Sequence, residues 1–123
     1  MTVTIEFPQP GPLMSMNDRP HWATKARAVR TWRTAACVAA DATPHRLLPP
    51  GLVELHLPVP DRRRRDPMNY APTLKACVDG LVDAGLWPDD TPEFVRTLEP
   101  TLYVVPRSAP RVVRITITDR PDW

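Results

Sequence analysis

Three segments of the chain alternate apolar and polar side chains, as half-buried β-strands do, and they span residues 3–7, 53–57 and 112–118. Two others repeat apolar side chains at helical spacing, and they span residues 24–40 and 73–85. Residues 94–105 predict one more strand, interrupted near Pro100. The order β-α-β-α-β-β predicts a small α+β domain with a mixed sheet of about four strands and two helices.

Local signals define the ends and faces of these elements. Thr73 is the predicted N-cap of the second helix, and Gly85 is its predicted C-terminal stop. The inward stripe of that helix consists of Leu74, Cys77, Val78 and Leu81. The first helix has a similar stripe, made of Val29, Trp32, Ala36 and Ala39 with Ala40. Residues 106–110 predict a turn, so we expect the last two strands to form a hairpin.

Composition suits one domain over residues 1–123, with an apolar fraction of 42% that is ordinary for a globular protein. Seventeen prolines against four glycines indicate short elements joined by stiff loops. A net charge of +2 does not by itself indicate a nucleic-acid partner. The chain has fourteen arginines and two lysines, however, and the arginines are grouped. Arginine suits bidentate phosphate contacts, although a GC-rich genome also favours it.

Several classes of protein are excluded by what the sequence lacks. Residues 1–8 have no basic start followed by an apolar run, and no segment approaches the roughly 20 apolar residues of a membrane span. Cys37 and Cys77 each fall in a predicted helix, which favours buried thiols over a disulfide. No zinc-type pairing of Cys and His, glycine-rich nucleotide loop or G-x-S-x-G motif occurs. We therefore expect a cytoplasmic protein with no membrane segment and no nucleotide cofactor.

The densest candidate chemistry lies in residues 60–90. Four consecutive arginines, 62–65, repel one another unless an anion binds there, which favours a nucleic-acid backbone. Asp66 follows them directly, and Asp89 and Asp90 form an acidic pair beyond the second helix. Carboxylates beside a basic run suit Mg²⁺ or Mn²⁺, because such ions take oxygen ligands and activate water for phosphodiester hydrolysis. This stretch predicts a metal-dependent DNA endonuclease.

Each of these residues also has a structural explanation. Asp66 would neutralise the arginine run, and Asp89 with Asp90 would form an exposed turn. Lys75 is four residues before Asp79, so it either forms a helix ion pair or donates to a scissile phosphate. The cations of the first helix form either a solvated face or a phosphate-contacting edge: Lys25, Arg27, Arg30 and Arg33.

Three motifs in order then become specific: D-R-R-R-R-D-x-x-N, a lysine at the start of a helix, and D-x-L-x-x-A-G-x-W-x-D-D. Together they resemble the RusA family of Holliday junction resolvases. The similarity is close over residues 61–90 and looser at Ser15-Met16-Asn17 and in the T-I-T-D that ends at Asp119. It implies a small α+β homodimer, often encoded by a phage or prophage. Such dimers cut four-way junction DNA symmetrically with Mg²⁺ or Mn²⁺ in recombination and repair.

The resemblance assigns roles to individual positions of this chain. It implies that Asp66, Lys75 and Asp90 are catalytic, and that Asp66, Asp89 and Asp90 hold the metal. Two extra residues separate Lys75 from the family asparagine, which is Asn69 here. We expect DNA contacts from the following residues: Asn17, Arg19, Lys25, Arg27, Arg30, Arg62, Arg63, Arg64, Arg65 and Asn69.

Met68 departs from the family pattern, which is D-x-D-N where this chain has D-P-M-N. In an extended segment Asp66 and position 68 would point the same way, so two acids would reach one ion, whereas a thioether is a poor ligand for it. Either other oxygens complete the site and the chain is an active endonuclease, or the chain binds junctions and cuts poorly. A third interpretation is a basic module that binds RNA or protein through its arginines.

Overall fold

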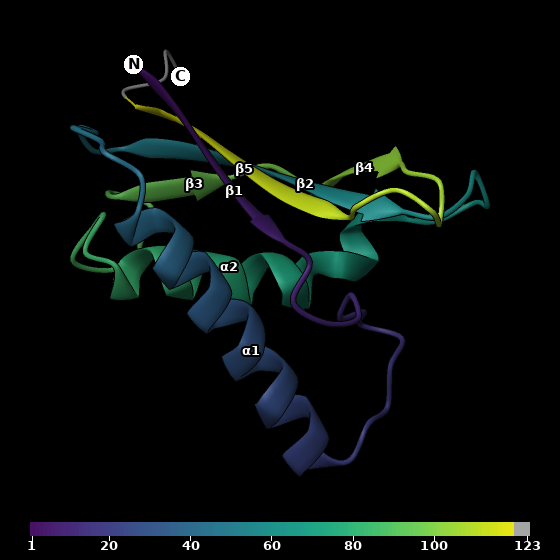
Figure 1. The fold of residues 1–123 in the computed structure, drawn as a ribbon. Coiled ribbons are helices and arrows are strands. Elements are labelled where there is room, and N and C mark those ends of the chain that lie inside the picture. Colours follow the sequence, from purple (N-terminus) through teal and green to yellow (C-terminus); the bar gives the residue numbers. More distant parts are fainter. Residues whose placement is uncertain (120–123) are drawn as a thin grey trace.

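The computed structural model describes residues 1–119 and places two helices on one face of a mixed sheet (Figure 1). The strands are β1 (Thr2–Pro8), β2 (Gly51–Val59), β3 (Val95–Thr97), β4 (Thr101–Val104) and β5 (Val112–Asp119). The helices are α1 (Trp22–Asp41) and α2 (Ala71–Asp83), and a 3-10 turn, η1 (Pro67–Tyr70), leads into α2. The predicted α+β domain is confirmed. It has five strands instead of about four, because the segment around Pro100 divides into β3 and β4.

The hairpin predicted for the last two strands is wrong. Strand β5 lies between β1 and β2 and is antiparallel to both, whereas β3 and β4 pair in parallel with successive parts of β2. The inward side chains of β5 are Val113, Ile115 and Ile117, and all three are fully buried. A strand with such an apolar face gains more burial between two neighbours than at an edge, which explains its central place.

The core lies between the sheet and the helices, as the apolar periods predict. Alternate residues of β1, β2 and β5 are buried, and the α2 stripe of Leu74, Cys77, Val78 and Leu81 packs in the same core. Trp32, Ala36 and Ala40 bury one side of α1. Burial raises the pKa of the Cys77 thiol to about 12, which makes it an unreactive core residue.

The two helices cross closely at Gly80. A Cβ atom at Gly80 would lie 2.3 Å from the Arg33 carbonyl oxygen and 2.9 Å from the Ala36 Cβ. Only a residue without a side chain allows this approach between α1 and α2. The helix crossing therefore depends on the glycine in the middle of α2.

The prediction that Thr73 caps α2 is wrong, because the helix begins two residues earlier, with Tyr70 as its N-cap. Thr73 is buried instead, and its hydroxyl accepts a hydrogen bond from the Met14 amide (2.8 Å) and donates one to the Met14 carbonyl (2.9 Å). This pair ties the loop after β1 to the first turn of α2. The predicted stop at Gly85 is confirmed: α2 ends at Asp83, and Gly85 follows with a φ of 87°.

The N-terminal part of α1 extends beyond the body of the molecule. Figure 1 shows this end of the helix farthest from the sheet, with the loop after β1 returning beside it. Trp22, the first residue of α1, is 76% exposed. Within residues 1–119, neither helix combines the length and the apolar composition needed to cross a membrane.

Candidate active site

Lys75 lies on the exposed side of α2 and connects two acids. Its ammonium is 3.0 Å from Asp79 Oδ1 and also hydrogen-bonds Asp90 Oδ2, which comes from the loop beyond α2. The structural ion pair with Asp79 thus exists, and a second pair joins Lys75 to the predicted catalytic acid. Lys75 and Asp90 line an open hollow of about 520 Å³.

The two charges of this pair reinforce each other. The hydrogen bond from Lys75 lowers the pKa of Asp90 below its ordinary value. Hydrogen bonds to Asp90 and then to Asp79 raise the pKa of Lys75 above 10.5. Both groups therefore stay ionised at neutral pH, and the Lys75 side chain is still 62% exposed to an incoming anion.

The loop that brings Asp90 back to α2 follows from the helix stop. After Gly85, Leu86 and Trp87 are buried, which anchors the chain against the core before the acidic pair. Asp89 Oδ1 accepts a hydrogen bond from the Asp90 amide at 2.7 Å. Asp89 thus takes the turn-forming role that the sequence left open, while Asp90 reaches Lys75.

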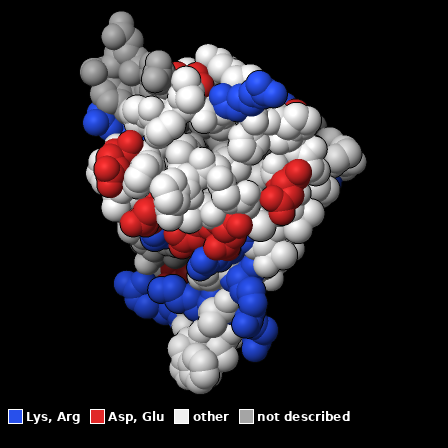
Figure 2. Space-filling model, turned by 90° about the vertical axis from the view of Figure 1, so that its left-hand side faces the viewer, with Lys and Arg blue, Asp and Glu red and all other residues white. Residues whose placement is uncertain are grey.

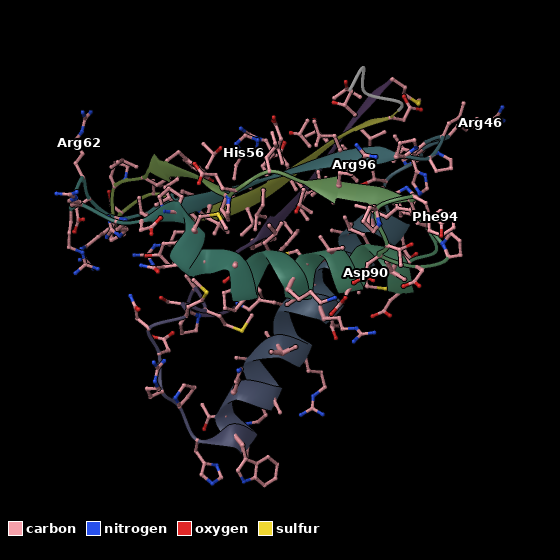
Figure 3. All side chains as sticks on the ribbon, turned by 180° about the vertical axis from the view of Figure 1, so that it is seen from behind. Arg46, His56, Arg62, Asp90, Phe94 and Arg96 are labelled. Carbon is pink, nitrogen blue, oxygen red and sulfur yellow. The ribbon has the colours of Figure 1, made fainter. Side chains whose placement is uncertain are left out.

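Three arginines of the run line a second open hollow, of about 530 Å³, at the loop after β2. Residues predicted to bind DNA or metal gather in its lining: Asn17, Arg63, Arg64, Arg65, Asp66 and Asn69. Arg62 lies apart from them, at the tip of the loop beyond the sheet (Figure 3). The structure therefore brings together the early loop and the arginine run, which are far apart along the chain.

Arg65 differs from the other three arginines of the run. Its side chain is only 8% exposed, and its guanidinium binds Asp61 Oδ1 at 3.0 Å and the carbonyls of Asp61 and Arg63. The pKa of Asp61 is lowered, first by the backbone amide of Arg63 and also by Arg65. Arg65 therefore holds the loop in its conformation, and the exposed positive charge of the run comes from residues 62–64.

Asp66 also takes part in the local fold. Its Oδ1 accepts a hydrogen bond from the Met68 amide at 3.0 Å, and the chain turns into η1 immediately after it. The expectation that Asp66 and position 68 share an extended segment is therefore wrong, because Pro67–Tyr70 is helical. The Met68 side chain is 45% exposed.

Asp66 and Asp90 line different hollows, and no residue lines both. Within residues 1–119, no three His, Cys, Asp or Glu side chains form a group that could hold a metal ion. As placed, Asp66, Asp89 and Asp90 do not fit one shared ion.

The remaining predicted DNA contacts lie on the projecting part of α1 and the loop before it. A groove of about 780 Å³ lies between this loop and α1, and Arg19 and Lys25 line it. Arg27 and Arg30 are exposed on the helix. Figure 2 shows Lys and Arg gathered at this end of the molecule, with a band of acids above them. Arg33 differs, because it binds both oxygens of Asp83, at 2.5 and 2.8 Å.

Sequence reasoning did not single out Arg96 or Tyr70. Arg96 lines the Lys75 hollow because β3 runs beside β2, and this pairing had no local signal in the sequence. Tyr70 lines the arginine hollow at the start of α2. Comparison of the chain with protein-family models and with curated proteins found no match.

Proposed function

We propose that this chain is a structure-specific DNA endonuclease, similar to the RusA family, that hydrolyses phosphodiester bonds at four-way junctions. The observation that carries this proposal is the Lys75–Asp90 pair, which joins two of the three predicted catalytic residues in one exposed hollow. The second hollow holds the third, Asp66, among arginines. We propose that one DNA strand contacts both hollows and passes the start of α2, where Tyr70 lines one hollow and Ala71 the other.

The exposed arginines are suited to binding DNA, and Lys75 is suited to the cleavage reaction. The exposed arginines 62–64 attract a polyanion and contact its phosphates without reading its sequence. The exposed ammonium of Lys75, oriented by Asp79 and Asp90, can donate to a phosphate oxygen as negative charge develops on it. Shape, not base sequence, then selects the substrate.

Metal dependence stays a prediction from the resemblance. When bound, Mg²⁺ or Mn²⁺ supplies an activated water and neutralises charge on the phosphate. Because Asp66 and Asp90 line separate hollows, we assign no step to such an ion in this arrangement. We also propose a two-fold homodimer, since a symmetric four-way junction presents two equivalent strands for cleavage.

The proposal is tested with an end-labelled, immobile four-way junction and a linear duplex of the same sequence. The purified protein is incubated with each DNA in Mg²⁺, in Mn²⁺ and in EDTA. We expect paired nicks in the junction, in either metal, and none in the duplex. If the protein binds the junction but does not nick it in either metal, the proposal that it is an endonuclease is refuted.

A second candidate function is a junction-binding protein that does not cut. Two observations favour it: a methionine at position 68, and the separation of Asp66 from Asp90. Competition with RNA and linear duplex separates both candidates from a basic interaction module, which would prefer those ligands to junction DNA.

A further inference from the structure

The apolar face of α1 continues past the body of the molecule and ends in an exposed indole. Trp22 lies at the same angular position on the helix as Val29, Ala36 and Ala40, because they follow at intervals of whole helical turns. The last two are buried against the rest of the protein, whereas Trp22 is 76% exposed. A large aromatic ring is therefore held at the projecting end of a rigid element, without a partner from residues 1–119 that buries it.

Positive charge is concentrated in the part of the chain that carries this ring. Arg19, Lys25, Arg27 and Arg30 are all exposed near it in the chain, and none of them forms an ion pair with an acid of residues 1–119. Asp18, the acid nearest to Trp22 in the sequence, accepts a hydrogen bond from the Ser15 amide. Figure 2 shows an uncharged tip with Lys and Arg on either side of it.

The charge pattern decides which partner covers the indole. A second copy of this chain, docked by a two-fold axis through the same tip, would place these four cations opposite their counterparts. Such like-charge contacts oppose association. A nucleic acid offers what the tip lacks, which is phosphates for the cations and flat aromatic bases for the ring.

We propose that Trp22 stacks on the exposed face of a base at the branch point of DNA, while Arg19 and Lys25 contact the phosphates beside that base. The form of the substrate, a branched DNA, rests on the function proposed above. The stacking contact explains how a protein that reads phosphates distinguishes a branch from linear duplex. Inside a linear duplex every base is stacked on both sides, whereas a base pair at an open branch point lacks a stacking neighbour on one side, and the indole can take that place.

The local geometry presents the ring for this contact. The His21 ring lies beside the indole, with ring centroids 5.4 Å apart and planes inclined by 36°. His21 is in turn fixed by the Ala23 amide, which donates to its Nδ1 at 3.2 Å. The groove lined by Arg19 and Lys25 runs beside the same end of α1 and leaves room for the sugar-phosphate chain.

The test uses 2-aminopurine, whose fluorescence falls when the base stacks on an aromatic ring, placed at the branch point of a four-way junction. The variants are Trp22→Ala and Trp22→Phe, with Val38→Ala as the control. Val38 is also exposed on α1, at 62%, but lies at the end of the helix away from the cations. We expect Trp22→Ala to lose the quenching and about tenfold in junction affinity, with duplex affinity unchanged. Trp22→Phe should retain most of both, and Val38→Ala should match the wild type.

A second DNA separates this inference from the proposed function. It is a linear duplex with one unpaired 2-aminopurine in a bulge. If the wild type shows no preference for the junction, the proposed function fails, but quenching at the bulge that depends on Trp22 still supports stacking. Equal quenching by the wild type and Trp22→Ala on both DNAs overturns the inference, as does a wild type that quenches neither.

Discussion

Lys75 and Asp90 are fifteen residues apart in the chain and hydrogen-bond each other at the hollow formed by α2, β3 and the loop between them. This contact depends on two local features, the stop of α2 at Gly85 and the burial of Trp87. Each partner holds the other ionised and in place. The pair is therefore the part of the candidate site where a single substitution is most informative.

Replacing Lys75 should separate chemistry from binding. In the proposed enzyme, Lys75→Met keeps the aliphatic stem but removes the donor, and kcat should fall by about 10²–10³-fold. Junction affinity should change little, because the exposed arginines provide the phosphate contacts. Lys75→Arg keeps a cation and should retain more of the rate. Single-turnover cleavage and a gel-shift titration measure the two quantities, and unchanged cleavage by Lys75→Met would leave Lys75 as a helix ion pair only.

An acid at position 68 should create a metal response. In Met68→Asp the new carboxylate lies two residues from Asp66, so the two charges repel and the Tm should fall without metal. Added Mg²⁺ should restore the Tm, because a hard cation binds paired carboxylates and not a thioether. Met16→Asp is the control, since Met16 is similarly exposed. Thermal melts with and without Mg²⁺ make the measurement, and a Tm that Mg²⁺ does not restore contradicts a metal position beside Asp66.

Two neighbouring arginines should behave differently. Arg64→Ala removes an exposed cation, so the slope of log affinity against log salt should decrease by about 0.9 if that residue contacts one phosphate. Arg65→Ala instead leaves Asp61 without its guanidinium and should loosen the loop after β2. Binding at several salt concentrations, together with proteolysis of the loop, distinguishes the two effects. Equal salt slopes for Arg64→Ala and the wild type would remove Arg64 from the DNA contacts.

The Arg33–Asp83 pair should stabilise the protein only above acidic pH. Arg33 lowers the pKa of Asp83 below 3.8 in the folded state. The stability that the pair contributes is therefore fully present above the pKa of Asp83 in the unfolded chain, near 3.8. It is lost as the pH falls through the lower pKa that Asp83 has in the folded protein. Since both side chains are more than a third exposed, Asp83→Asn should cost at most about 1 kcal/mol at pH 7. Urea unfolding at pH 7 and at pH 2.5 measures this difference, and the same cost at both values would refute the assignment.

The close helix crossing predicts a clear contrast between two glycines. Gly80→Ala places a Cβ against the Arg33 carbonyl and should destabilise the protein by about 1–3 kcal/mol. Gly11→Ala is the matched control, because nothing lies within 4 Å of the added atom. Equilibrium unfolding measures both variants. Equal stability of Gly80→Ala and Gly11→Ala would mean that the helices separate at no cost.

The periods of apolar residues predict β1, α1, β2, α2 and β5, because burial against one sheet face requires those periods, whereas the one strand predicted over residues 94–105 divides into β3 and β4. They do not predict that β5 lies between β1 and β2, because the sequence of β5 does not indicate which strands it pairs with. Thr73 illustrates a second limit: a residue type that favours helix caps is used here to hold the Met14 backbone. For the candidate site, the sequence predicts the residues but not their grouping. Lys75 meets Asp90, a contact that the sequence did not predict, while Asp66 caps η1 and Arg65 binds within its own loop.

The central place of β5 has a consequence for biosynthesis. Strand β1 is translated before every other strand of the described sheet, yet its strand partner there is β5, which follows all the others. The nascent chain therefore carries an unpaired apolar strand until residues 112–119 emerge from the ribosome. Until then β1 is open to wrong pairing with other chains, so we expect co-translational chaperones to assist the folding of this domain.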